Sequence, residues 1–163
     1  MNDHSNGVPD GASDTAGVIA PPPLIYAGAL GVGLLAKALF PATFLPGGVA
    51  RALGLPLTGS GLLLFISSIR AMRRRETDVR PYKPTTSIVT EGPYRFTRNP
   101  IYLGFTLVYG GVSALANSPW AILLLPFVLG LMQRGVIERE ERYLERVFGE
   151  EYTRYKARVR RWI

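Results

Sequence analysis

Long apolar runs dominate this sequence and limit the folds that it can adopt. The first run covers residues 24–45 and the second covers residues 53–72, and each is long enough to cross a hydrocarbon core of ~30 Å as a helix. Two shorter runs, 100–117 and 119–135, are separated by a tight Asn-Ser-Pro turn, and Pro126 is expected to kink the last helix. The sequence therefore predicts an all-α integral membrane helical bundle with about four transmembrane helices, followed by cytoplasmic C-terminal helices.

The basic residues are kept apart from the apolar runs. The chain of 163 residues is 47% hydrophobic, yet its 19 Lys and Arg give a net charge of +7. They cluster at the ends of apolar segments, in 70–98 and 134–161, whereas a nucleic-acid binder would carry them on a groove-facing helix or patch. The positive-inside rule places both basic segments and both termini in the cytoplasm, with the bundle in the plasma (inner) membrane.

Composition excludes several kinds of site. The chain has no cysteine, which rules out disulfides, thiolate nucleophiles and cysteine metal sites. Its one histidine, His4, lies in a polar N-terminal tail, so we expect no metal site. That tail, residues 1–20, is rich in Gly, Ser, Asp, Asn and Pro and is expected to be disordered. Residues 21–163 are then expected to form a single membrane domain.

Two features of the first apolar run each have two interpretations. Lys37 is either a functional cation within the membrane or a side chain that extends to the interface. Residues 28–33 (GALGVG) resemble part of a dinucleotide-binding fingerprint, but no strand precedes them and no acidic residue follows at the required distance. Small residues at this spacing favour close packing against another helix.

The C-terminal region has the pattern of two short helices. Gly149 is expected to end the first helix. A second helix would present Tyr152, Tyr155 and Val159 on one face. The residues expected to meet anionic headgroups and the membrane interface are Arg158, Arg160, Arg161 and Trp162.

A polar segment, residues 85–104 (TTSIVTEGPYRFTRNPIYLG), leads into the third apolar run. Gly92 and Pro93 mark a turn. Pro100 suits the first turn of a helix, which makes Asn99 a natural N-cap. One interpretation of this segment is therefore a capped membrane helix with interfacial tyrosines and arginines.

Glu140 and Glu141 follow the fourth apolar run, on the side of the membrane where Asn99 is expected. Carboxylates so close to the membrane are costly unless they are paired. The candidate partners are Arg95, Arg98, Arg134 and Arg139. The two glutamates either belong to a solvated, salt-bridged helix face or form one site with the polar segment.

Two motifs in this order resemble the isoprenylcysteine carboxyl methyltransferase and phospholipid methyltransferase family of integral membrane enzymes. The first motif is IVTEGPYRFTRNPIYLG, and the second is EERYLERVFGEEYTRYKARVRRWI, with an apolar hairpin between them. The resemblance covers residues 77–163, and the two preceding spans have the layout of that family.

The resemblance implies S-adenosylmethionine (SAM) as the methyl donor, held by residues 77–163 at the cytoplasmic membrane face. It implies that Glu140 binds the cofactor and that Glu141 supports it. Val136 stands where the carboxyl methyltransferases have an arginine that faces the substrate carboxylate, so Arg134 or Arg139 would have to replace it. The implied catalytic residues are Glu140, Glu141, Arg134 and Arg139. The implied cofactor-binding residues are Ser87, Ile88, Val89, Tyr94, Arg98, Asn99, Pro100, Ile101, Tyr102 and Glu140.

The implied acceptor is a lipidic or prenylated molecule that enters from the bilayer. Asn99 stands where the carboxyl methyltransferases usually have histidine and favours N-methylation of a phospholipid amine, whereas FGEEYTRYKARV favours O-methylation of a carboxylate. A carboxylate needs an arginine for orientation, and an amine must lose a proton, for which Glu141 is a candidate base. Two further interpretations of the chain are an NADPH-dependent reductase of the sterol type and a non-catalytic membrane protein.

Overall fold

The computed structural model describes residues 16–75 and 87–163, and every regular element in these ranges is helical. In chain order the elements are α1 (Pro22–Leu39), α2 (Gly47–Arg74), the 3-10 turn η1 (Gly92–Arg95), α3 (Pro100–Leu115), α4 (Pro119–Met132), the π-helical turn η2 (Gln133–Ile137), α5 (Glu138–Phe148) and α6 (Glu150–Arg158). The prediction of an all-α fold is confirmed.

Three helical stretches are long and apolar enough to cross a membrane, namely α1, α2 and the continuous stretch Pro119–Phe148. Helix α3 is also apolar but has 16 residues, fewer than the roughly 20 that a spanning helix needs. The four apolar helices agree with the predicted integral membrane bundle. Helix α1 ends at Leu39 rather than near residue 45, because Pro41 disfavours helical geometry in the residue before it.

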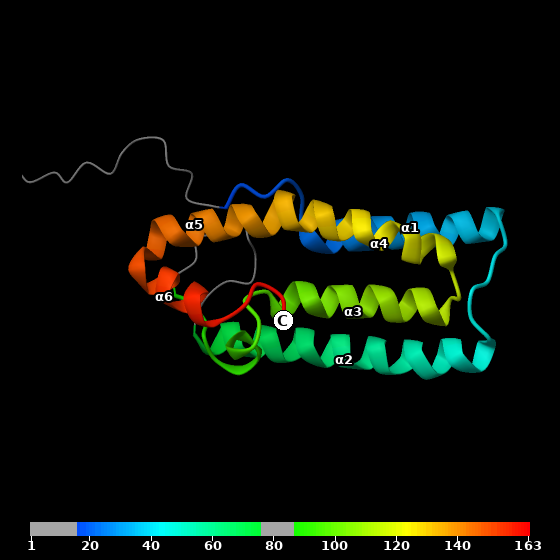
Figure 1. The fold of residues 1–163 in the computed structure, drawn as a ribbon, viewed down its shortest axis with the longest axis horizontal. Coiled ribbons are helices and arrows are strands. Elements are labelled where there is room, and N and C mark those ends of the chain that lie inside the picture. The colour runs from blue at the N-terminus through cyan, green and yellow to red at the C-terminus, as the bar shows by residue number, and fades with distance from the viewer. Residues whose placement is uncertain (1–15, 76–86) are drawn as a thin grey trace, which may run out of the picture.

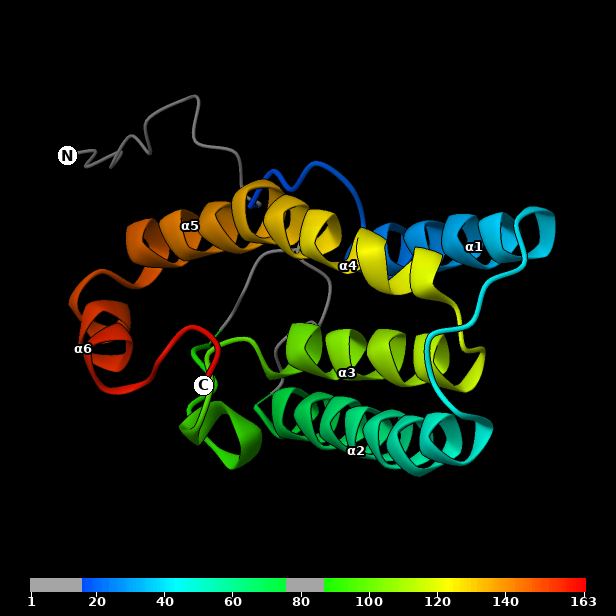
Figure 2. The ribbon, with the colours of Figure 1, turned by 45° about the vertical axis from the view of Figure 1, so that its right-hand side comes forward.

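The helices form two layers (Figure 1). Helices α1 and α4 lie side by side in one layer and α2 and α3 in the other, as the turned view also shows (Figure 2). Helix α5 continues α4 beyond the bundle, and α6 turns back toward the α2–α3 layer. We call this the α6 end, and we call the opposite end, where residues 40–46 and 116–118 connect the helices, the loop end.

Glycines allow the helices within each layer to approach closely. A Cβ on Gly111 of α3 would lie 2.5 Å from the backbone nitrogen of Thr58 in α2. In the other layer, a Cβ on Gly33 of α1 would lie 2.5 Å from the Cα of Ala121 in α4. Small residues at such contacts are the usual means of packing helices in membranes. The predicted close packing of the first apolar run is therefore confirmed at Gly33.

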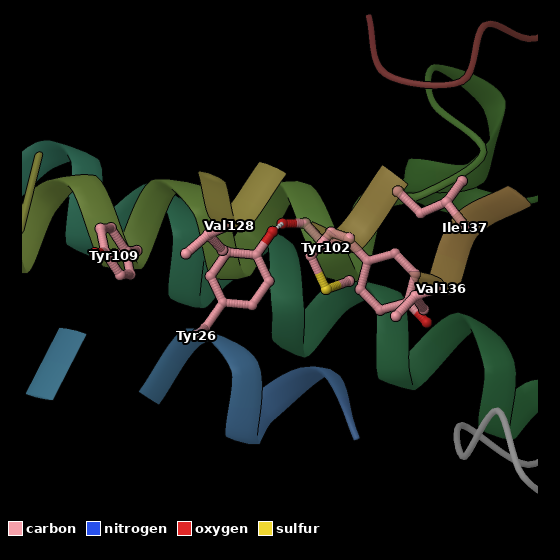
Figure 3. Packing of buried hydrophobic residues seen from close by; sticks show 7 residues of the cluster. Tyr26, Tyr102, Tyr109, Val128, Val136 and Ile137 are labelled. Atoms are coloured by element: carbon pink, nitrogen blue, oxygen red, sulfur yellow. Dashed lines mark hydrogen bonds between the residues drawn. The ribbon is translucent and has the colours of Figure 1, made fainter. Parts of the chain in front are cut away.

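Tyrosines fill much of the interior between the layers (Figure 3). The buried cluster contains Tyr26, Tyr102, Tyr109, Val128, Met132, Val136 and Ile137. The hydroxyl oxygen of Tyr26 lies 2.8 Å from Oγ1 of Thr106, and the hydroxyl of Tyr109 donates to the carbonyl of Ala121 at 2.8 Å. A buried hydroxyl without a partner is costly, so these bonds allow polar rings to fill an apolar core.

Polar side chains at the loop end satisfy backbone groups. Asn117, at φ +50°, accepts hydrogen bonds from the N–H groups of Phe44 and Leu45 and donates to the carbonyl of Leu45. The ammonium group of Lys37 donates to the carbonyl of Ala116, just past the end of α3. Of the two interpretations of Lys37, this contact supports a side chain that extends toward the end of the bundle.

Two expectations about local structure concern the N-terminal tail and helix α4. Residues 16–20 are not disordered, because the N–H of Ile19 donates to the carbonyl of Gly135 at 3.2 Å and the Ile19 side chain covers that glycine. Residues 1–15, the rest of the expected tail, lie outside the described residues. Helix α4 continues through Pro126, so the expected kink there stays a prediction, and the geometry changes from α to π at η2.

Candidate functional site

The polar segment before α3 is bonded to the helices on either side of it. Gly92, at φ +57°, begins the turn η1 as the sequence predicts. Tyr94 in this turn is buried, and its carbonyl accepts a hydrogen bond from the hydroxyl of Tyr155 in α6 at 2.8 Å. On the other side, Glu91 forms an ion pair with Arg75 at the end of α2. These contacts place the segment at the α6 end of the bundle.

Tyr102 and Glu140 bring the two polar motifs together. Tyr102 lies in the first turn of α3, and its hydroxyl donates to Oε1 of Glu140 at 2.5 Å. The Tyr102 ring lies beside Val136 and Ile137 of η2, the turn that leads into α5 (Figure 3). Glu140 is half-buried, and no arginine or lysine of the described ranges forms an ion pair with it.

Glu141, the next residue along α5, lies in a different environment. It is 5% exposed, and Arg161 binds it through two hydrogen bonds, from Nε to Oε1 at 2.9 Å and from Nη2 to Oε2 at 2.7 Å. Nη1 of Arg98 lies 3.1 Å from Oε1 of the same carboxylate. These two arginines compensate the buried charge of Glu141, which would be costly without such partners.

Arg98 has hydrogen-bonding capacity that the described residues do not use. Its side chain is 8% exposed, yet within the described ranges Nε and Nη1 make no hydrogen bond of good geometry. Burial raises the pKa of the neighbouring Tyr152 hydroxyl to about 12, against the opposing effect of the Arg98 charge, so Tyr152 is neutral at physiological pH. Buried guanidinium donors of this kind suit an anionic group of a ligand, such as a carboxylate.

The C-terminal segment, residues 159–163, runs back across the start of α3. The N–H of Arg98 donates to the carbonyl of Arg160 at 2.9 Å. The carbonyl of Arg161 accepts two further bonds, from Oγ1 of Thr97 at 3.1 Å and from Nδ2 of Asn99 at 2.9 Å. Asn99 occupies the N-cap position of α3, but its side chain makes no capping hydrogen bond. The prediction of a side-chain cap is wrong, because the amide is bonded to the C-terminal segment instead.

The expectation that Arg161 and Trp162 face lipid headgroups also needs correction. The guanidinium of Arg161 points inward and is bound to Glu141. Nε1 of Trp162 donates to Oε1 of Gln133 in η2 at 3.2 Å, and the ring packs against the buried cluster. Both side chains are therefore half-buried and bonded to residues of the α6 end.

Arg134 and Arg139 do not join the two glutamates. Both arginines are exposed, and Nη1 of Arg139 donates to the carbonyl of Gly17 at 2.9 Å. Within the described ranges, neither forms an ion pair with Glu140 or Glu141. Arg139 instead lines a shallow groove on the outer face of α5, next to residues 16 and 17.

Arg161 is the site residue that sequence reasoning missed. Of the arginines considered as partners for the glutamates, the structure brings Arg98 to Glu141, whereas Arg95 is exposed. Arg161 and Arg160 are adjacent and chemically identical, so no local pattern shows which of them turns inward. The path of the chain after α6 decides this.

The remaining candidates surround the start of α3. Pro100 and Val89 are buried, and Ile101 is half-buried and packs against the cluster of Figure 3. Ser87 and Ile88 are also half-buried. Oγ of Ser87 donates to the carbonyl of Arg75 at 3.0 Å. Among the described residues, no group of His, Asp and Glu side chains could hold a metal ion.

Part of the chain is similar to named methyltransferases. Over 72 residues it is 33% identical to protein-S-isoprenylcysteine O-methyltransferase B of Arabidopsis thaliana and 36% identical to the protein-S-isoprenylcysteine O-methyltransferase of Saccharomyces cerevisiae. These matches cover 44% of this chain but only 36% and 30% of the two enzymes. An uncharacterized protein of Haemophilus influenzae is 47% identical over 49 residues, which are 30% of this chain and 76% of that protein. No solved structure matches the chain.

A family model described as phospholipid methyltransferase matches residues 49–151. The matched range includes most of α2, the polar segment that leads into α3, and both Glu140 and Glu141. It covers more than half of the 163 residues and both sides of the Tyr102–Glu140 contact. The chain belongs to the phospholipid methyltransferase family.

Proposed function

We propose that this protein is an integral membrane methyltransferase that transfers the methyl group of SAM to the carboxylate of a lipidic or prenylated acceptor. The observation that carries the proposal is the contact between Tyr102 and Glu140, which joins the two polar motifs at one end of a membrane bundle. Family membership supports methyl transfer. The relatives named isoprenylcysteine O-methyltransferase support a carboxylate acceptor.

The side chains at the α6 end have the charges that SAM requires. Glu140 is a half-buried carboxylate that suits a cationic amino group or sulfonium, and Arg98 has buried donors that suit a carboxylate. When bound, SAM supplies a methyl group already activated on sulfur, so the protein needs mainly to hold and orient two reactants. We propose that residues 87–89, Tyr94 and residues 99–102 complete this binding region.

An acceptor carboxylate is already nucleophilic, so it needs a cation for orientation more than it needs a base. Arg134 and Arg139 are the proposed cations. Arg134 is the better placed, because it lies in η2 where the apolar part of the span ends, whereas Arg139 is bonded to Gly17. The apolar tail of the acceptor would enter from the bilayer, between the helices.

N-methylation of a phospholipid amine is the second candidate, because the matching family is described as phospholipid methyltransferase. An amine must lose a proton, and Glu140 rather than Glu141 would take it, since two arginines hold Glu141. Asn99 has a structural role in addition to the N-methylation that the resemblance favours. Its amide is bonded to the carbonyl of Arg161, which accounts for a polar side chain at this position whatever the acceptor.

We propose that the α6 end faces the cytoplasm of a plasma (inner) membrane. Exposed basic side chains gather at this end, on the last turn of α2 and on α5 and α6. The loop end, by contrast, carries Arg51 and Lys37. Cytoplasmic segments next to membrane spans carry an excess of Lys and Arg, which gives this orientation.

Two measurements test the proposed function. Calorimetry of the purified protein in detergent, with SAM and separately with NADPH, should show binding of SAM. Binding of NADPH alone would indicate a reductase, and binding of neither would indicate a non-catalytic membrane protein. A lipid extract incubated with the protein and methyl-labelled SAM should then give a base-labile product, the property of an ester. A base-stable label on an amine would establish the second candidate instead.

A further inference from the structure

We propose that Arg161 is a positioning residue of this site and that residues 159–163 form a strap that holds α5 in its working orientation. Through Glu141, Arg161 fixes the direction in which Glu140 points toward Tyr102 and the ligand. The inference rests on the proposed function, because it concerns the binding of SAM beside Glu140.

The strap is bonded to the chain that enters α3. The carbonyl of Arg160 accepts from the N–H of Arg98, and the carbonyl of Arg161 accepts from the side chains of Thr97 and Asn99, all between 2.9 and 3.1 Å. Two successive carbonyls are thus bound by three successive residues of the other segment. These bonds fix the position of the strap along residues 97–99, and this sets where the Arg161 side chain lies.

On its other side the strap is bonded to η2 and α5. Arg161 binds both oxygens of Glu141 at 2.9 and 2.7 Å, and the fork geometry of guanidinium and carboxylate fixes their relative orientation as well as their distance. Trp162 binds Gln133 in η2 at 3.2 Å. The strap therefore links the start of α3 to the start of α5, two segments that meet again at Tyr102 and Glu140.

Helix α5 needs such an anchor because η2 interrupts the regular helix before it. A π-helical turn changes the phase of the residues that follow, so α4 alone does not determine which face α5 turns inward. Consecutive residues of an α-helix point about 100° apart. Once Arg161 holds Glu141, the direction of Glu140 is fixed as well.

Arg161 also keeps Arg98 available. With Arg161 in place, Glu141 has two cationic partners, and Arg98 retains buried donors without hydrogen bonds in the described ranges. Without Arg161, Glu141 would have Arg98 as its remaining ion-pair partner among the described residues. Arg98, whose Nη1 already lies 3.1 Å from Oε1 of Glu141, would then pair with it more closely, and its donors would be less available to the ligand.

The strap can be observed directly through Trp162. The chain has two tryptophans, and the other, Trp120, lies at the loop end, where it donates to the carbonyl of Phe40. In a Trp120→Phe background, acrylamide quenching of the full-length protein in detergent reports on Trp162 without any ligand. Arg161→Gln should increase the quenching of Trp162, because the strap loses the two hydrogen bonds from the guanidinium to Glu141. The matched control is Arg158→Gln, since Arg158 is exposed and bonded only within α6 among the described residues.

The same variants are then titrated with SAM by calorimetry. We expect Arg161→Gln to weaken SAM binding by about tenfold or more, the usual effect of losing a charge-assisted pair, while Arg158→Gln leaves it unchanged. Arg161→Lys keeps the charge but loses the fork, so its SAM affinity should lie between those of Arg161→Gln and the unsubstituted protein. Circular dichroism at the titration temperature verifies that each variant is folded.

The outcomes separate the two proposals. Increased quenching together with weaker SAM binding, partly restored by lysine, supports the positioning role. Unchanged SAM affinity in a folded Arg161→Gln protein would overturn the positioning role while leaving the proposed function intact. Unchanged quenching of Trp162 in the Arg161→Gln protein would also overturn it, because the strap would then be held without the contact between Arg161 and Glu141. Failure of the unsubstituted protein to bind SAM would overturn the proposed function and this inference together.

Discussion

The two ends of the bundle use polar side chains in different ways. At the loop end, Asn117, Lys37 and Trp120 all bind backbone groups of a neighbouring segment. At the α6 end, side chains also bind one another, and two guanidiniums, those of the buried Arg98 and the partly exposed Arg161, hold the buried carboxylate of Glu141. One end completes the hydrogen bonds that helix termini leave open. The α6 end buries charged groups, which are not needed to close a loop.

This difference separates what holds the fold together from what carries the chemistry. Burying ions has a desolvation cost that their mutual attraction seldom exceeds by much, so a buried ion-pair network is weak evidence for stability. Ionisable residues close to a membrane are instead a mark of a functional site. We therefore expect substitutions at the loop end to change stability and substitutions at the α6 end to change binding.

The largest effect on binding is expected for Glu140→Gln. This substitution keeps the shape of the side chain and removes its charge. SAM affinity should fall by up to about 100-fold, since an interaction with a charged group is worth about 1.5–3 kcal/mol. Calorimetry measures the change, with Glu145→Gln on the same helix as the matched control. Equal SAM affinity for Glu140→Gln and the unsubstituted protein would contradict the assignment of Glu140.

The next effect concerns stability at the loop end. Asn117→Ala removes three hydrogen bonds to residues 44 and 45 and places alanine at φ +50°, a conformation that it rarely adopts. The free energy of unfolding should fall by about 2 kcal/mol, and SAM affinity should not change. Thermal unfolding in detergent measures the loss, and Thr43→Ala on the same connection is the control. Weaker SAM binding by a folded Asn117→Ala protein would break the distinction between the two ends.

A smaller effect on binding is expected for Tyr102→Phe. The ring stays in the core, but Glu140 loses the hydroxyl that donates to it, so its position is less well fixed. SAM affinity should fall by about five- to tenfold. Tyr109→Phe is the control, because it also removes a hydroxyl from α3. That hydroxyl donates to the carbonyl of Ala121 and not to Glu140. If both substitutions weakened SAM binding equally, the effect would come from packing rather than from Glu140.

The smallest effect concerns alkaline pH. Burial raises the pKa of Tyr152 to about 12, whereas an unfolded tyrosine has a pKa of about 10. The folded state therefore resists ionisation, and this contribution to stability is fully present below about pH 10 and is lost as the pH rises through about 12. Unfolding temperatures measured from pH 8 to pH 12 should be level at first and then fall. The fall should be smaller in Tyr152→Phe, and an equal fall would exclude Tyr152 as a cause.

Several helix boundaries were predictable because their signals are local, although α1 ends before residue 45 and α2 begins before residue 53. Pro22, Pro100 and Pro119 stand in the first turns of α1, α3 and α4, where their missing N–H groups are not needed, and Gly149 ends α5 at φ +50°. The resemblance of two motifs to one family indicated that Tyr102 and Glu140 belong to the same site, and the structure places them 2.5 Å apart.

The role of Asn99 was not predictable from its neighbours. Before Pro100, a side chain that can accept a hydrogen bond is the usual cap of a helix. In the structure, its amide Nδ2 donates a hydrogen bond to the carbonyl of Arg161, a residue far away in the sequence. Local pattern describes what a side chain can do with its own helix, and it contains nothing about a segment that returns from elsewhere.

By itself, the sequence determined an apolar four-helix core, its proline and glycine boundaries, and two polar motifs at the ends of the runs, because these depend on residues near one another in the chain. The tertiary structure alone decided that Arg161 rather than Arg134 or Arg139 binds Glu141, and that Glu140 faces Tyr102. The phase of α5 after η2 and the return path of residues 159–163 set these contacts. Both depend on packing between distant segments, which no local pattern encodes.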